Sequence, residues 1–194
     1  MNINKQSGFT LAEVLIVLAC SAIVGTILVT ILVQGSSIFN DQNTRVNQNL
    51  SLNSINSKIT QQIQFASSVA STFSSGSTTY SSGPDTLVTK IPSVDSTGSV
   101  IDSKFDTMII SSDPIDKNIL KLWIYPDISS SRKAETLVLT NQLSFIQFSY
   151  LNDEAVPTTP QTATRVDFIV KIAEKTNATI KESSISGRAN LKNL

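Results

Sequence analysis

A single carboxylate, Glu13, interrupts the most apolar stretch of the sequence. It is the only charged residue between Lys5 and Asp41, whereas 30 charged residues in 194 correspond to about five in 35. A carboxylate deep in a bilayer costs on the order of 2.5 to 3.5 kcal/mol and normally has a partner. Glu13 also lies only about 6 Å inside the expected start of the helix. It is therefore either one half of a buried ion pair or a side chain that reaches back to the headgroups.

The stretch around Glu13 has the length and composition of a membrane span. From Phe9 to Val33, 19 of 25 residues are apolar, and residues 14–33 carry no charge. As a helix, this uncharged run is about 30 Å long, which matches the hydrocarbon core of a bilayer. We therefore predict a transmembrane helix over residues 9–33 rather than a buried core helix or a secretory signal. Lys5 favours a cytoplasmic N-terminus, with the remainder of the chain outside the cytoplasmic membrane.

The residues around Glu13 form a recognisable string, Lys5-Gln-Ser-Gly-Phe-Thr-Leu-Ala-Glu13. It closely resembles the N-terminal processing motif of type IV prepilins and type II secretion pseudopilins. In that family a prepilin peptidase cleaves a short basic leader between a glycine and a phenylalanine, and then methylates the new amine. The resemblance assigns cleavage to Gly8 and Phe9, methylation to Phe9 and the family's glutamate to Glu13. Residues 1–8 are then the leader peptide.

Elementary chemistry explains why these residue types suit such roles. Glycine has no Cβ that would obstruct a protease reading extended backbone at the membrane face. Cleavage leaves a positive amine on Phe9 at the apolar boundary. In a bundle of helices, the Glu13 carboxylate can pair with the Phe9 amine of a neighbour, because low dielectric makes an unpaired charge costly. We therefore predict that Glu13 serves assembly rather than catalysis.

After Val33 the pattern becomes amphipathic, and we predict that the same helix continues over residues 34–66. Apolar residues recur at helical spacing among Asn, Gln and Ser, and no proline occurs before Pro84. The predicted apolar face comprises Ile38, Val46, Leu50, Ile55, Ile59, Ile63 and Ala66. This face is expected to pack on the globular part of the chain.

The remaining sequence divides into a loop and a β-rich domain. Residues 67–85 are rich in Ser, Thr and Gly and are predicted to be a flexible loop rather than a glycosylated stalk. Residues 86–194 contain short segments rich in β-branched and aromatic residues, and those at 143–151 and 165–175 alternate with period two. The predicted fold class is α+β, with the long N-terminal helix packed on an antiparallel β-sheet domain, as in pilins.

A second resemblance rests on the order of segments in the C-terminal half. It is similar to the larger J-type minor pseudopilins and W-type minor pilins, which imply a low-copy subunit near a filament tip, joined to other minor subunits. Those proteins often close with an Arg-Asn pair, where this chain has Lys192-Asn193. The segments that carry this resemblance are residues 143–151, the turn through Pro157 and Pro160, residues 165–172 and the closing residues 187–194.

Several kinds of chemistry have no support in the sequence. The chain has no histidine, which excludes Ser-His-Asp and Cys-His catalysis and every imidazole metal site. It has no glycine-rich phosphate loop. The aspartates at 95, 102, 106, 113 and 116 match no calcium loop, and Trp123 and Tyr125 are expected to pack rather than bind a ligand. We predict no enzyme activity, no cofactor and no metal site.

The expected function is that of a structural minor pilin or pseudopilin subunit of a type IV pilus or type II secretion pseudopilus. Its partners would be prepilin peptidase, other pilin or pseudopilin subunits, the cytoplasmic membrane and an assembly platform. The alternative is a binding module at a pilus tip for adhesion or DNA uptake. Residues 34–194 hold 14 basic and 14 acidic side chains, so their charge gives no indication of nucleic acid as a partner.

Overall fold

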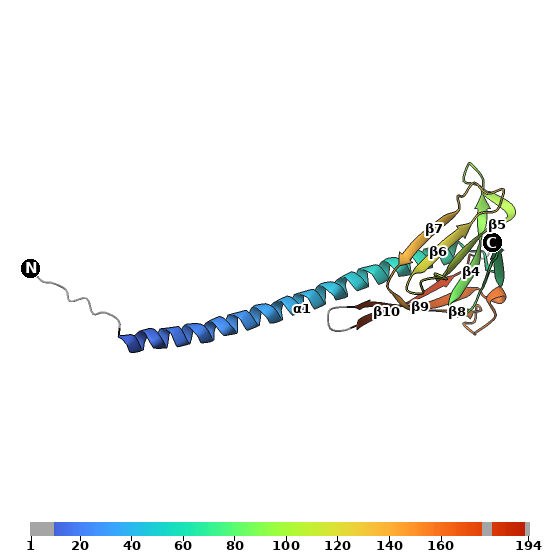
Figure 1. Ribbon diagram of the computed structural model, residues 1–194. Coiled ribbons are helices and arrows are strands. Elements are labelled where there is room, and N and C mark those ends of the chain that lie inside the picture. Colours follow the sequence, from blue (N-terminus) through green and yellow to red (C-terminus); the bar gives the residue numbers. More distant parts are fainter. Residues whose placement is uncertain (1–9, 176–179, 193–194) are drawn as a thin grey trace, which may run out of the picture. The chain divides into compact units, whose positions relative to one another are not determined.

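The computed structural model describes residues 10–175 and 180–192 and has the predicted α+β layout. Its contacts divide the chain into two compact units, Met1–Val46 and Asn47–Leu194. Helix α1 crosses the boundary, and the described strands all belong to the second unit (Figure 1). The elements are α1 (Leu11–Phe65), β1 (Ser68–Val69), β2 (Thr72–Ser75), β3 (Thr78–Ser81), β4 (Thr86–Val94), β5 (Val100–Ser112), β6 (Leu120–Tyr125), β7 (Glu135–Thr140), β8 (Leu143–Leu151), the 3-10 turn η1 (Pro160–Thr162), β9 (Arg165–Lys175) and β10 (Ile180–Asn190).

The buried face of α1 begins later than the sequence suggested. Ile55, Ile59 and Ile63 are buried as predicted, and the stripe is extended towards the N-terminus by Leu52 and Gln48. The predicted members Ile38, Val46 and Leu50 are instead exposed. At about 100° per residue, Val46 and Leu50 lie about 180° and 140° around the helix from Ile55, so they cannot share its face.

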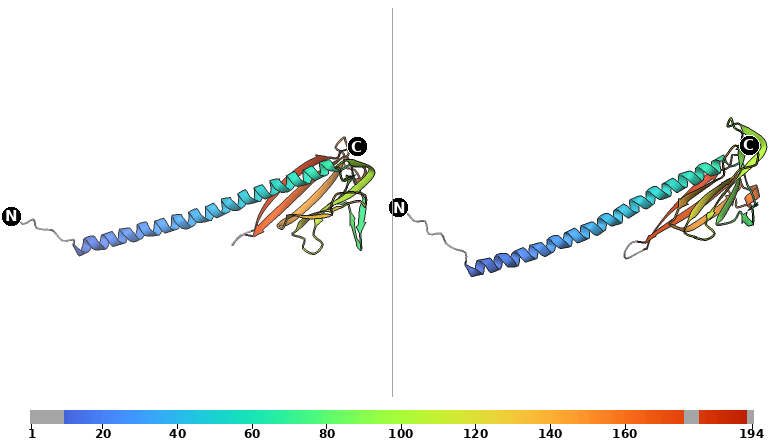
Figure 2. Two further views of the ribbon diagram at one scale, coloured as in Figure 1. Left: turned by 90° about the horizontal axis from the view of Figure 1, so that it is seen from above. Right: turned by 45° about the horizontal axis from the view of Figure 1, so that its top comes forward.

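The described strands of the β-domain form two large antiparallel sheets and the two-stranded sheet β2-β3. The larger has the strand order β1-β4-β5-β6-β7, and the smaller has the order β10-β9-β8. Figure 2 shows the C-terminal part of α1 lying along the strands of the second unit. One core cluster joins the helix stripe to the inner faces of both sheets, with members such as Ile59, Met108, Leu122 and Phe168. The sheets therefore use the amphipathic end of the helix as part of their core.

The alternation predicted in β8 and β9 is confirmed. In β9, Val166, Phe168, Val170 and Ile172 are all buried, and β8 buries every second residue from Ile146 to Tyr150. A register shift between Leu143 and Phe145 adds one residue to β8. A bulge of this kind changes the side-chain alternation, which is why Leu143 is also buried.

The prediction of a loop over residues 67–85 is wrong for most of that segment. It holds β1 and the hairpin β2–β3, in which Phe73 and Tyr80 are directly paired. The ring of Phe73 lies 5.1 Å from that of Tyr125, and the ring of Tyr80 lies 5.7 Å from that of Trp123. This aromatic pair, one residue from each strand, packs against the rings of β6 and holds the hairpin on the larger sheet. The Ser- and Thr-rich composition of the segment gave no indication of this hairpin.

Two contacts fix α1 against β10. Gln48 is 2 % exposed, and its Nε2 donates to the carbonyl of Lys181 at 3.1 Å while its Oε1 accepts from Ser183 Oγ at 2.8 Å. Further along, a Cβ on Gly187 would lie 2.1 Å from Phe168 Cζ and 2.2 Å from Asn56 Oδ1. Position 187 therefore requires glycine because α1 and β9 approach it closely.

Candidate assembly site at the start of helix α1

The first turn of α1 is held by reciprocal hydrogen bonds between Thr10 and Glu13. The Thr10 backbone N–H donates to Glu13 Oε2 at 2.9 Å, and the Thr10 hydroxyl donates to the same oxygen at 3.0 Å. In return, the Glu13 backbone N–H lies 3.3 Å from Thr10 Oγ1. This is a capping box, which satisfies backbone donors that a helix start otherwise leaves without partners. It also fixes the carboxylate beside the first residues of the helix.

Beyond this turn, the surface of α1 is apolar and exposed. Every residue from Leu11 to Asn43 is exposed, although most of those up to Val33 are apolar. The helix is long and apolar enough to cross a membrane, and none of its most apolar stretch is buried. The hydroxyls of Thr26 and Thr30 donate to the carbonyls one turn earlier, at 2.7 and 2.8 Å. The segment therefore presents lipid or other helices with few unsatisfied polar groups.

The predicted site residues have different outcomes. Gly8 and Phe9, the expected cleavage and methylation residues, lie outside the described residues. Glu13 lies on the first turn, and its exposed carboxylate is bound by Thr10. The sequence motif contains Thr10, but the hydrogen bonds between Thr10 and Glu13 were not predicted from it. The spacing Thr-x-x-Glu before an apolar run is a capping-box pattern, so this contact could have been found from the sequence.

The aspartates elsewhere hold loops in shape. A hydrogen bond from Lys121 is the main cause that lowers the pKa of Asp113 to about 2, together with the backbone N–H groups of Asp116 and Ile115. Hydrogen bonds from Thr97 lower the pKa of Asp95. In the part of the chain that the structure describes, no group of three or more acidic or cysteine side chains could hold a metal ion. These carboxylates are therefore accounted for as structural acceptors.

The raised pKa values of two tyrosines, the buried Tyr150 and the partly buried Tyr80, also have a structural explanation. Burial raises the pKa of Tyr150 to about 12, and its hydroxyl lies 3.0 Å from the carbonyls of both Gly83 and Thr86. Burial likewise raises the pKa of Tyr80, which lies beside Tyr125. Both groups remain protonated at neutral pH and fix the segment that carries the hairpin to β8 and β6.

Comparison with known proteins locates the similarity at the N-terminus. Residues 3–29 match the prokaryotic N-terminal methylation motif. That match covers 27 of 194 residues and includes Gly8, Phe9 and Glu13. No curated protein and no solved structure matches the chain. The motif supports a relationship to the type IV pilin and pseudopilin family, whose members are generally structural proteins, and the exposed apolar helix fits membrane anchoring.

Proposed function

We propose that this chain is a structural minor subunit of a type IV pilus or type II secretion pseudopilus. The observation that carries the proposal is the methylation motif at residues 3–29, followed by an exposed apolar helix with one acid near its start. An apolar surface of this length is unstable in water but is suited first to a bilayer and then to a bundle of helices. The β-domain would remain outside the membrane.

Processing would precede assembly. Prepilin peptidase would cleave between Gly8 and Phe9 and methylate the Phe9 amine, next to the turn in which Thr10 holds Glu13. The capping box supports the assembly role because it keeps the Glu13 carboxylate at the end of the helix where a neighbour's amine would lie. The ion pair would then set the axial register of adjacent subunits, since an unmatched charge in an apolar bundle is strongly disfavoured.

The proposed subtype is a larger minor subunit of the J or W type. Its support is the succession of β8, β9 and β10 with a closing segment that returns to the helix, where Lys192 N donates to the Ala66 carbonyl at 2.8 Å. Such a subunit would join other minor subunits near a filament tip. No observation in the described residues favours the alternative of a tip module that binds DNA or a surface.

The processing step is tested with the full-length chain expressed beside a prepilin peptidase. Wild-type chain should lose residues 1–8 and start at a Phe9 that is heavier by one methyl group, as read by mass spectrometry of the N-terminal peptide. Gly8→Leu should remain uncleaved because its side chain obstructs the scissile backbone. Cleavage of Gly8→Leu at the same bond would show that the assignment is wrong.

The assembly role of Glu13 is tested in sheared filaments. Glu13→Ala and the isosteric, uncharged Glu13→Gln should both be cleaved normally and then be depleted from filaments by about tenfold or more, as expected from loss of a buried pair. The pair of variants separates charge from shape. If Glu13→Gln enters filaments as well as wild type, the ion-pair role is lost and a hydrogen-bonding role remains.

A further inference from the structure

Strand β7 leaves one edge of the larger sheet without a neighbour. It is the last strand in the order β1-β4-β5-β6-β7, and among the described residues its backbone forms no hydrogen bond outside the pairing with β6. The β8 edge of the smaller sheet is partly covered, since Phe148 N donates to the Pro84 carbonyl at 2.7 Å. In β7, every second residue therefore points an N–H and a C=O away from the sheet.

The composition of β7 lacks the devices that usually protect an exposed edge. Its six residues include no Lys and no Pro. A register shift with β6 lies at the Thr140 end and leaves residues 135–138 in regular pairing. Val138 is 51 % exposed, and Leu137 and Leu139 pack on the core but are only partly buried. A further strand beside β7 would continue the ladder and cover these leucines.

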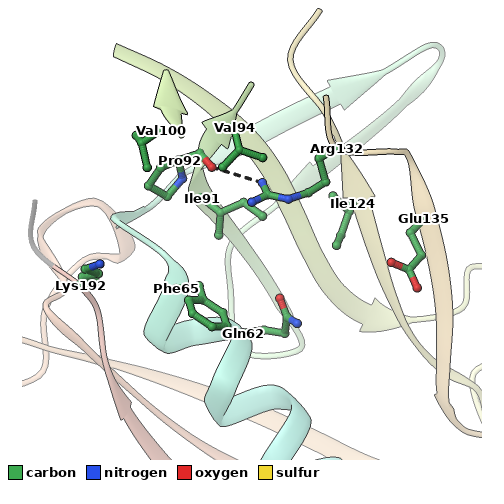
Figure 3. Close-up of a pocket in the computed structure, with 10 residues that line it drawn as sticks. All are labelled: Gln62, Phe65, Ile91, Pro92, Val94, Val100, Ile124, Arg132, Glu135 and Lys192. Atoms are coloured by element: carbon green, nitrogen blue, oxygen red, sulfur yellow. Dashed lines mark hydrogen bonds between the residues drawn. The ribbon is translucent and has the colours of Figure 1, made fainter. Parts of the chain in front are cut away.

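A pocket of about 600 Å³ opens at the Glu135 end of β7 (Figure 3). Glu135 lines it and is paired with the buried Ile124 of β6, so its side chain lies on the core face of the sheet. Helix α1 ends at Phe65, which also lines the pocket and is 54 % exposed. A strand beside β7 would place the side chain opposite Glu135 on this face, at the side of the pocket.

Another wall of the pocket is fixed by a buried carboxylate. Asp106 is fully buried and accepts hydrogen bonds from the Asp127 N–H at 2.9 Å and from Ser130 Oγ at 3.0 Å. It also pairs with Arg132, whose Nη1 donates to the Pro92 carbonyl at 3.3 Å, as Figure 3 shows. These contacts hold the segment that leads into β7 on β4 and β5. The edge is thus preformed, which lowers the cost of binding a partner.

We propose that an extended segment of a different filament subunit adds a strand to β7. Outward N–H and C=O groups that alternate along a strand are matched by another polypeptide backbone, so the ligand is a protein segment rather than a glycan or a nucleic acid. Apolar residues at period two in that segment would cover Leu137 and Leu139. A cation would lie opposite Glu135, because this exposed carboxylate forms no ion pair within the described chain.

A second copy of this chain does not fit the edge. Two β7 strands would pair antiparallel around a two-fold axis perpendicular to the sheet, and that axis would reverse one subunit relative to the other. Residues 47–65 of α1 lie along the strands (Figure 2), so the two helices would run in opposite directions. Helices that start in one membrane cannot do so. The inference thus rests on the proposed function, which makes the chain a low-copy subunit beside different subunits.

The test uses a short diazirine amino acid at position 136 or 138 of the full-length chain, in cells that assemble it. Irradiation of filaments should join the chain to a different subunit, and the sites reached from the two positions should lie two residues apart in that partner, because paired strands stay in register. The matched control is the same probe at Thr78, an exposed threonine of β3 as Thr136 is of β7, and it should not give this adduct. An adduct between two copies, partner sites three or four residues apart as on a helix, or an equal yield from position 78 would overturn the proposal.

Charge reversal adds an independent readout. Glu135→Lys should lower the yield of the adduct by about threefold, because it places like charges opposite one another. Glu154→Lys, at an exposed acid in the turn after β8, is the control and should leave the yield unchanged. Equal yields from both variants would contradict a cation opposite Glu135. Filaments that contain the chain without the adduct overturn the docking alone, whereas a chain that is neither cleaved nor assembled overturns both proposals.

Discussion

The two halves of helix α1 reverse the usual relation between hydrophobicity and burial. Residues 11–46 contain the most apolar run of the chain, yet none of them is buried. Residues 47–65 are rich in Asn, Gln and Ser, yet Gln48, Leu52, Ile55, Ile59 and Ile63 are all buried. The hydrophobicity of a helix segment therefore does not by itself determine whether that segment is buried in the core of the protein.

Arrangement of the apolar residues separates the two halves. In the second half they form a narrow stripe at spacings of three and four, which one sheet face can cover. In the first half they surround the helix, so no single face of one domain could bury them, and lipid or several neighbouring helices are the suitable environment. One continuous helix thus carries a surface for its own fold and a surface for a different environment.

The largest expected effect comes from the same substitution, isoleucine to alanine, made once in each half of α1. Ile59→Ala should destabilise the β-domain by about 2 to 5 kcal/mol, because Ile59 is fully buried. Ile27→Ala, at a position 53 % exposed, should leave that domain unchanged. Denaturant unfolding of the full-length chain in detergent can be followed by fluorescence, since Trp123 is the only tryptophan and lies in the β-domain.

Similar destabilisation by both substitutions would contradict the comparison. It would mean that residues 11–46 contribute to the stability of the β-domain. A small effect of Ile59→Ala alone would instead show that the stripe of α1 is not a central part of the core. Processing of both variants by the peptidase serves as the control for correct membrane insertion.

A smaller loss is expected at Gly187 of β10, where Asn56 of α1 lies close to the strand. Gly187→Ala places a methyl group within 2.6 Å of three side-chain atoms of Phe168 and Asn56, so it should cost about 1 to 3 kcal/mol through overpacking. Gly83→Ala is the control, because its nearest atom is 4.0 Å away and its φ is not positive. Equal melting temperatures of the two variants would show that α1 can move away from β10.

Much of the fold was predictable because its strands repeat with period two. The segments expected at 143–151 and 165–175 coincide with β8 and β9, and the helix was expected at 9–66 and is described at Leu11–Phe65. The hairpin β2–β3 was missed because its aromatics, Phe73 and Tyr80, are isolated among Ser and Thr. Phe73 packs on Tyr125, 52 residues later, and Tyr80 packs on Trp123, 43 residues later, so no local pattern in the sequence contains these contacts.

The candidate site was predictable to a different extent. A short motif with fixed spacing identified Glu13, and the same motif contains the Thr10 that caps it. Gln48 was not predictable as a buried residue, because a polar side chain breaks an apolar pattern. It is buried only because β10, more than 130 residues away, supplies a carbonyl and a hydroxyl.

The polar contact in the buried half gives the next prediction. Gln48→Ala removes two hydrogen bonds to β10 and should cost about 1 to 2 kcal/mol. Asn49→Ala, at the adjacent exposed position, is the control and should change stability little. Hydrogen exchange of the Ser183 and Lys181 amides should rise in Gln48→Ala alone. If both variants have the same free energy of unfolding, the hydrogen bonds of Gln48 do not contribute to the packing of residues 47–65 on the sheet.

The smallest expected effect is a pH dependence confined to the β-domain. The pKa of Asp113 is lowered to about 2, mainly by Lys121, against an ordinary value of about 3.9 in an unfolded chain. A lowered pKa stabilises the fold above the unfolded value, and this contribution disappears as the pH falls from about 4 to about 2. Wild type should therefore be more stable than Asp113→Asn at pH 6, and the difference should shrink as the pH falls and vanish only below about pH 2.

Glu13→Gln should leave the unfolding profile of the β-domain unchanged at every pH, because Glu13 lies in the half that contributes nothing to that core. A change in that profile would show that the two halves are energetically coupled despite their opposite burial.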